Sequence, residues 1–154
     1  MPHVELSLTD VPSAHRPTTS ASGGSLRQWS SAVAEANEPC LVLDADAVIV
    51  AASASCAELL GLGQPGGDPA AAHGRKLRDA VYPMVDFTAA RAELDENETH
   101  MIPPLLALSS GRMARGLIRV ACPETGYVST LDAIATPLVD GPDIVGSLTF
   151  FARV

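Results

Sequence analysis

Residues 136–154 read TPLVDGPDIVGSLTFFARV, and this stretch decides the fold. Two runs rich in aliphatic and β-branched residues are separated by Asp-Gly-Pro-Asp at 140–143, a composition typical of a turn. In the second run every second position falls on one face, which carries Ile144, Gly146, Leu148 and Phe150. The pattern predicts a terminal antiparallel hairpin with one face buried.

A further strand is expected immediately upstream of this hairpin. Residues 112–123, RMARGLIRVACP, place Arg115 and Arg119 on one face and Ile118, Val120 and Cys122 on the other. Residues 128–138, VSTLDAIATPL, alternate in the same way, with apolar Leu131, Ala133 and Ala135 opposite Thr130 and Asp132. ETGY at 124–127 is the turn between them. Together the three runs predict an antiparallel meander.

A second hairpin is predicted near the start of the foldable chain. CLVL at 40–43 and VIVA at 48–51 flank Asp-Ala-Asp-Ala, in which Ala47 stands where such a turn prefers glycine. A short helix, SCAELLGLG, should follow. We expect Ser55 and Glu58 to form its capping box and Gly61 or Gly63 to end it.

The chain before this hairpin divides into two parts. Residues 1–24 are rich in Ser, Thr, Pro and Gly without a period and are expected to form a flexible tail. Residues 25–37 predict an amphipathic helix with an S-x-x-Q capping box at Ser25 and Gln28. Its apolar stripe consists of Leu26, Trp29, Val33 and Ala36. This stripe either packs on the chain's own sheet or docks on a second copy; in the latter case Leu26, Trp29 and Val33 form a dimer interface.

The middle of the chain predicts short helices. Pro83 should break the first of them, and the acidic run between Glu93 and Glu98 should face solvent. The pair Pro103-Pro104 suits a helix start and Gly111 its end. The expected order is therefore a helix, two strands, several short helices and three strands. This order predicts an α+β fold, a five-stranded antiparallel sheet with helices on one face.

Composition limits the classes of partner. The chain has 154 residues, 47% of them hydrophobic, and a formal net charge of -8. Such a balance argues against general binding to nucleic acid or to an anionic membrane, because phosphate contacts need Lys and Arg. The chain shows neither a signal peptide nor a membrane span, so we expect a cytoplasmic protein. The spacing of the three cysteines predicts no zinc site and suggests small buried thiols.

Three stretches resemble the PAS domain family. They are ANEPCLVLDADAVIVAAS at 36–53, SCAELLGLG at 55–63 and ATPLVDGPDIVGSLTFFARV at 135–154, and the resemblance extends over residues 37–154. We therefore assign 38–154 to a PAS-like domain. The resemblance implies a bacterial sensory or interaction module rather than an enzyme. It would sense a small ligand or form a homodimer, and it would signal through a partner protein.

The resemblance also implies where a ligand would bind, between the sheet and its helices. The residues expected to line that cavity are Val42, Val50, Leu59, Ile118, Val120, Leu131, Ala133 and Leu148. The same residues suit a packed core without a ligand. His100 is the candidate ligand for a haem, but Pro104 disfavours a regular helix through both residues. The Asn-Cys-Arg-Phe motif of the flavin photoreceptors is missing, since Cys56 lies in ASCAELL.

Two alternatives remain open. One is a small acid–base enzyme on a curved antiparallel sheet, with Asp132 as its candidate acid; it requires a buried carboxylate with a raised pKa in an open cavity. The other is a roadblock-like dimerisation module, which also begins with an amphipathic helix followed by strands like VLDADAVIVAAS. Such modules usually end on a helix, whereas this chain ends on a strand-like run. We identify no catalytic residue and no metal site.

Overall fold

The computed structural model describes residues 24–62 and 68–154. The helices are α1 (Gly24–Ala34), α2 (Ala54–Leu60), the 3-10 helix η2 (Pro69–Ala72), α3 (Leu77–Ala80), α4 (Glu96–His100) and α5 (Pro103–Ser110). The strands are β1 (Cys40–Asp44), β2 (Ile49–Ala52), β3 (Met84–Val85), β4 (Ala114–Ala121), β5 (Val128–Asp140) and β6 (Asp143–Arg153). The predicted tail lies outside the described residues, except for Gly24, which begins α1.

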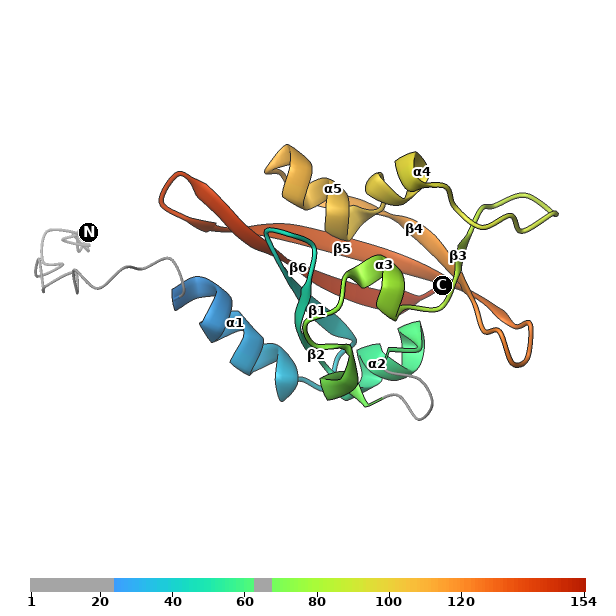
Figure 1. Cartoon of the computed structure of the whole chain (residues 1–154), viewed down its shortest axis with the longest axis horizontal. Coiled ribbons are helices and arrows are strands. Elements are labelled where there is room, and N and C mark those ends of the chain that lie inside the picture. Colours follow the sequence, from blue (N-terminus) through green and yellow to red (C-terminus); the bar gives the residue numbers. More distant parts are fainter. Residues whose placement is uncertain (1–23, 63–67) are drawn as a thin grey trace, which may run out of the picture.

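All the strands belong to one antiparallel sheet, in the order β2-β1-β6-β5-β4-β3 (Figure 1). The predicted α+β architecture is confirmed. The sheet has six strands rather than the five expected, because the two-residue strand β3 pairs with the edge of β4. The predicted hairpins β1–β2 and β5–β6 and the meander of β4, β5 and β6 are all present.

The last strand lies inside the sheet and not at its edge. β6 pairs with β5 on one side and with β1 on the other, where Cys40 lies opposite Phe150 and Asp44 lies opposite Gly146. The first hairpin is thereby joined to the C-terminal strands. Gly146, Ser147, Leu148 and Thr149 in the middle of β6 are all buried, so both faces of the strand are covered there.

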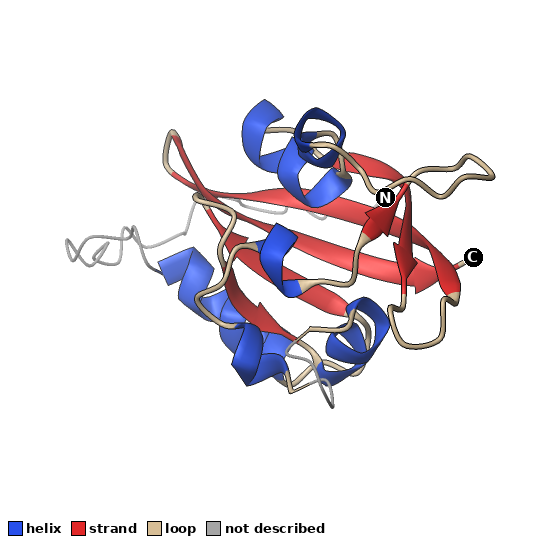
Figure 2. Ribbon diagram, turned by 45° about the vertical axis from the view of Figure 1, so that its right-hand side comes forward, coloured by secondary structure: helices blue, strands red, loops and turns tan. Residues whose placement is uncertain are grey.

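The two faces of the sheet carry different layers. The short helices α2 to α5 cover the inner face (Figure 2), where the larger core forms around Leu41, Leu43, Leu60, Leu131 and Phe151. On the outer face α1 packs across β1 and β2 and reaches β5 and β6. A smaller core forms there from Val33, Cys40, Val42, Ala51, Leu138 and Leu148.

Helix α1 differs in detail from its prediction. It begins at Gly24, so Ser25 lies in its first turn and is not its N-cap, and it ends at Ala34 rather than Asn37. Leu26 and Val33 pack against the outer face of the chain's own sheet, whereas 41% of Trp29 stays exposed. The apolar stripe is therefore split between intramolecular packing and solvent.

The face of β6 predicted to be buried is buried only in part, and it faces α1 rather than the inner core. Leu148 and Gly146 face α1, and Phe150 is 44% exposed, whereas Phe151 points into the inner core. Gly146 has a specific reason to be glycine. A Cβ at this position would collide with the carbonyl oxygen of Leu43 and come within 2.9 Å of the Leu26 Cδ1 atom. The close approach of β1 and α1 thus depends on a missing side chain.

The cap of α2 also corrects the prediction. Ser53, not Ser55, is the N-cap, and its hydroxyl accepts a hydrogen bond from the Cys56 amide at 3.2 Å. Ser55 lies within the first turn and donates to the Asn37 carbonyl instead. The helix ends at Gly61 in the left-handed conformation, as predicted.

In the middle segment the helix boundaries agree with those predicted from the prolines. α3 ends at Ala80, before Pro83, and α5 begins at Pro103 and is capped by left-handed Gly111, as predicted. α4 ends at His100, so no single helix runs through His100 and Pro104. The acidic run is exposed, and Asp95 and Glu98 form a capping box for α4.

Ala47 in the β1–β2 turn has an unfavourable backbone conformation, and the cost of this conformation can be measured. Ala47 adopts φ 63°, a left-handed conformation that costs a residue with a Cβ roughly 1–2 kcal/mol. We expect Ala47→Gly to raise the free energy of unfolding by about 0.5–1 kcal/mol, after allowing for the greater entropy of the unfolded glycine chain. Urea denaturation measures this change. Ala45→Gly, in the same turn but without a positive φ, is the control and should not stabilise; equal effects of the two variants would contradict the assignment.

Candidate functional site

The residues predicted to line one cavity are divided between the two faces of the sheet. Leu59, Ile118, Val120, Leu131 and Ala133 lie together in the inner core. Three others belong to the outer layer against α1: Val42, Val50 and Leu148. Consecutive strand residues point to opposite faces, so these three cannot line the same space as the other five.

The space between the sheet and the helices is almost filled. The internal cavity there measures only about 10 Å³ and is lined by apolar residues, among them Leu60, Met84, Ile102 and Phe151. A cavity needs roughly 10–15 Å³ to hold a single water molecule. In this conformation the interior is therefore a packed core.

Neither haem nor flavin fits this interior. A cavity of about 10 Å³ excludes both ring systems. His100 is exposed at the end of α4 and faces a surface groove, so it does not point into the core. Cys56 is completely buried on α2, and this burial raises the pKa of its thiol. The described residues around this cavity do not form a site for either cofactor.

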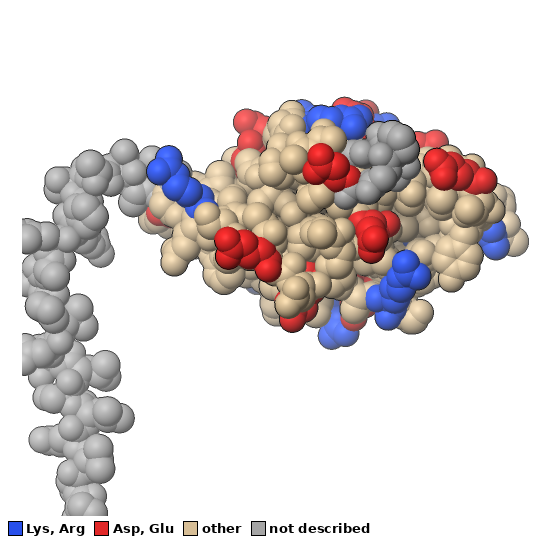
Figure 3. Space-filling model, turned by 90° about the horizontal axis from the view of Figure 1, so that it is seen from below, with Lys and Arg blue, Asp and Glu red and all other residues tan. Residues whose placement is uncertain are grey.

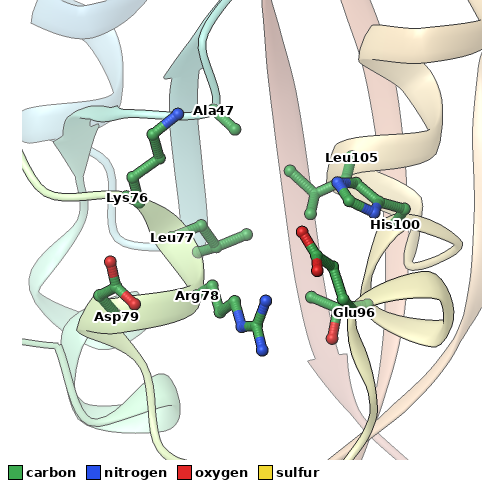
Figure 4. A pocket seen from close by; sticks show the side chains of 9 residues that line it. Ala47, Lys76, Leu77, Arg78, Asp79, Glu96, His100 and Leu105 are labelled. Atoms are coloured by element: carbon green, nitrogen blue, oxygen red, sulfur yellow. The ribbon is translucent and has the colours of Figure 1, made fainter.

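A larger opening lies on the surface, between α3 and α4. This groove, which we call the α3–α4 groove, has a volume of about 510 Å³ (Figure 4). Its lining comes from the β1–β2 turn, α3, α4 and the start of α5: Ala47, Lys76, Leu77, Arg78, Asp79, Glu96, Thr99, His100 and Leu105. Its volume falls within the range of small-molecule sites, roughly 300–1,000 Å³.

The backbone around Lys76 explains how this groove forms. The Ile49 amide donates to the Arg75 carbonyl at 2.9 Å, and the Leu77 amide donates to the Ala47 carbonyl at 3.0 Å. These bonds hold the segment that leads into α3 beside the first hairpin. The Lys76 Nζ atom then donates to the Asp46 carbonyl at 2.9 Å. One wall of the groove is thus fixed to the β1–β2 turn.

Sequence reasoning did not find this groove. Its charged residues come from segments that are separated in the chain and carry no shared motif. The available signal was weak: Lys76 is the only lysine of the chain. His73 is exposed and is not among the groove residues.

The outer face of the sheet carries a second candidate surface. α1 covers its β1–β2 side, but Leu117, Ile134 and Phe150 on the neighbouring strands are 51%, 36% and 44% exposed. Register places Ile134 directly opposite Phe150. We call these three residues together with Trp29 the outer apolar patch.

One ion pair crosses the same face. The guanidinium of Arg115 donates to both carboxylate oxygens of Asp132, at 3.2 and 2.7 Å. This hydrogen-bonded pair holds the pKa of Asp132 below its ordinary value and raises the pKa of Arg115. Figure 3 views the molecule from the side on which α1 lies in Figure 1, and shows a largely uncharged surface with scattered acidic and basic side chains.

The cysteines do not share one environment. Cys40 and Cys56 are buried, as predicted, but Cys122 is half-exposed in another surface groove of about 470 Å³, together with Tyr82 and Tyr127. Burial raises the pKa of Cys40. A hydrogen bond from the side chain of Thr125 lowers the pKa of Cys122, and neighbouring backbone amides act in the same direction.

No helix among residues 24–62 and 68–154 is long and apolar enough to cross a bilayer. In the same residues no three His, Cys, Asp or Glu side chains are grouped so that they could hold a metal ion.

Solved structures that share this architecture are PAS and LOV domains. The PAS domain of a protein from Colwellia psychrerythraea aligns with a TM-score of 0.55 and 15% identity, over 84% of this chain and 96% of that one. The LOV protein of Rhodobacter sphaeroides aligns with a TM-score of 0.59 and 12% identity, over 85% of this chain and 68% of that one. The Vibrio cholerae VqmA dimer aligns with a TM-score of 0.55 and 21% identity, over 84% of this chain and 52% of that one.

No protein-family model and no curated protein sequence matches the chain. At these identities the likeness establishes the fold. The domain is PAS-like, as its terminal hairpins predicted.

The thiol environments predict a difference in reactivity. The thiolate is the reactive form, so a lowered pKa makes Cys122 reactive at lower pH than an ordinary cysteine. We expect iodoacetamide to modify Cys122 first in the folded protein. When the labelling rate is plotted against pH, its midpoint should lie at a lower pH than that of a free thiol. Peptide mass spectrometry identifies the labelled residue.

Thr125→Val should move that midpoint upward, because it removes the hydrogen bond, whereas Ser129→Ala in the same groove should not. Faster labelling of Cys40 or Cys56 in the folded state would show that the burial argument is wrong.

Proposed function

We propose that this chain is a non-enzymatic signalling module that forms a homodimer through α1 and the outer face of its sheet, and that passes its signal to a partner protein. The observation that carries the proposal is the outer apolar patch. Leu117, Ile134 and Phe150 lie on three adjacent strands and are exposed next to a helix whose Trp29 is also exposed.

The position of this patch favours a protein partner. Single exposed apolar residues are ordinary, but burial of several apolar side chains from neighbouring strands against a partner lowers the free energy, because their surface is removed from water. On the outer face α1 covers β1 and β2 and reaches β5 and β6, but it leaves Leu117, Ile134 and Phe150 exposed. A second copy would supply a matching apolar surface, and a two-fold interface of this kind uses the same patch twice.

The fold comparison agrees with an assembling module. One of the similar structures is described as a dimer of VqmA, a LuxR-type receptor. The likeness to LOV photoreceptors supports a sensory role in the general sense. For this chain both remain parts of the proposal.

The acid–base enzyme alternative is less well supported. It requires a buried carboxylate with a raised pKa, and Asp132 was its candidate. Asp132 lies on the outer face, is paired with Arg115, and has a pKa that the pairing lowers. A carboxylate held in its ionised form by a fixed cation is a poor proton donor at neutral pH.

The dimer proposal is tested by mutation of the patch. Trp29→Glu and Ile134→Arg each place a charge in the proposed interface, and we expect each to shift a dimer to monomer, with a dissociation constant raised about tenfold or more. Light scattering coupled to size-exclusion chromatography measures the mass in solution.

Met101→Glu is the control, since Met101 is 64% exposed at the end of α4, away from the outer face. It should leave the mass unchanged. A monomeric unmutated protein, or a dimer that survives both patch mutations, would refute the proposed interface.

A further inference from the structure

The α3–α4 groove has the features of a ligand site that is separate from the packed interior. It opens at the surface, and its volume of about 510 Å³ contrasts with the internal cavity of about 10 Å³. Leu77 lines both spaces and is only 3% exposed. The side chain of Leu77 therefore closes the inner end of the groove.

The two walls of the groove carry opposite charges. Arg78 extends from α3 into the gap, and Glu96 extends toward it from α4 on the facing wall (Figure 4). They do not form a salt bridge, since the one salt bridge within residues 24–62 and 68–154 joins Arg115 and Asp132. Two unlike charges therefore face the same space without neutralising each other.

The cationic wall is strengthened by Lys76. Its Nζ atom is held by the Asp46 carbonyl at 2.9 Å, which fixes the position of a second positive charge beside the groove. Asp79 also belongs to the lining but points away from the gap in Figure 4. The α3 wall is thus positive where it faces the gap.

An apolar surface lies between the charged walls. Leu77 and Leu105 point into the groove from α3 and α5 (Figure 4). A ligand that matches this arrangement needs an anionic group, a cationic group and an apolar portion, all within a small molecule.

We propose that the α3–α4 groove binds a zwitterionic ligand of the α-amino acid class with an apolar side chain. The ligand carboxylate pairs with the Arg78 guanidinium, which offers a planar pair of donors, and Lys76 adds charge on the same side. The ligand ammonium group faces Glu96. The apolar side chain covers Leu77 and Leu105 and shields both ion pairs from water. The site is independent of the dimer interface proposed above.

The test uses L-phenylalanine as probe, with two matched derivatives. N-acetyl-L-phenylalanine lacks the ammonium group and L-phenylalaninamide lacks the carboxylate. Binding to the full chain is measured by calorimetry and by shifts of backbone amide NMR signals. We expect L-phenylalanine to bind and each derivative to bind at least about tenfold more weakly, since each has lost one charge-assisted contact.

Two variants test which charged residue of the groove contacts which charged group of the ligand. Arg78→Gln should weaken binding of L-phenylalanine about tenfold and should abolish the difference between L-phenylalanine and its amide. Glu96→Gln should abolish the difference between L-phenylalanine and its N-acetyl form. Such matched losses form a double-mutant cycle for each ion pair. Arg112→Gln and Glu124→Gln make the same charge changes at exposed positions outside the groove and should have no effect.

Three results would overturn the proposal. They are no binding at about 10 mM L-phenylalanine, well above a millimolar dissociation constant; equal binding of the three compounds; and undiminished binding by correctly folded Arg78→Gln and Glu96→Gln variants. Circular dichroism confirms folding of each variant. Because the outer apolar patch is untouched in these variants, their dimer mass reports separately on the proposed function.

Discussion

The pairing of β1 with β6 is the constraint on which the rest of the structure depends. It places the last strand in the middle of the sheet, where α5 and α1 contact β6 and its central residues are buried. Such long-range pairing closes the whole intervening chain as a loop, at an entropic cost that packing must offset. Because Gly146 has no side chain, β6 approaches both Leu43 and Leu26 closely enough to bring sheet and helix together. The intervening helices then occupy the inner face, and α1, which precedes β1, lies on the outer face.

The same constraint explains which strand faces could be predicted from the sequence and which could not. Alternation predicted β4 and β5 correctly, because their two faces differ in polarity. In β6 both faces are covered, and Ser147 and Thr149 are completely buried although both are polar. Alternation therefore could not show which side chains of β6 point into the inner core. The run at Cys40–Leu43 is apolar throughout, so no pattern could show that Val42 faces α1 while its neighbours face the inner core.

The sequence motif alone did not identify the N-cap of α2, because the backbone conformation selects between Ser53 and Ser55. Ser55 satisfies the S-x-x-E rule better than Ser53, yet Ser53 has the extended backbone of the residue that leaves β2, and this conformation makes it the cap. Strand β3 has only two residues and could not be predicted by period. The α3–α4 groove could not be predicted from the sequence for a different reason. Its lining is assembled by tertiary structure from a turn and three helices, and none of these segments alone resembles a site.

The β1–β2 hairpin lies between the two proposed surfaces. Its turn lines the groove through Ala47, and the carbonyl groups of Asp46 and Ala47 accept hydrogen bonds from Lys76 and Leu77. Its strands hold α1 through Val42, Ala51 and Val33. The segment leading into α3 is hydrogen-bonded to this hairpin, whereas α1 packs on the outer face of its strands. Ala47 already has an unfavourable backbone conformation, so a change of the turn costs less there than elsewhere in the hairpin. The two proposed surfaces thus share one hairpin, whose turn forms part of the groove wall and whose strands pack against α1.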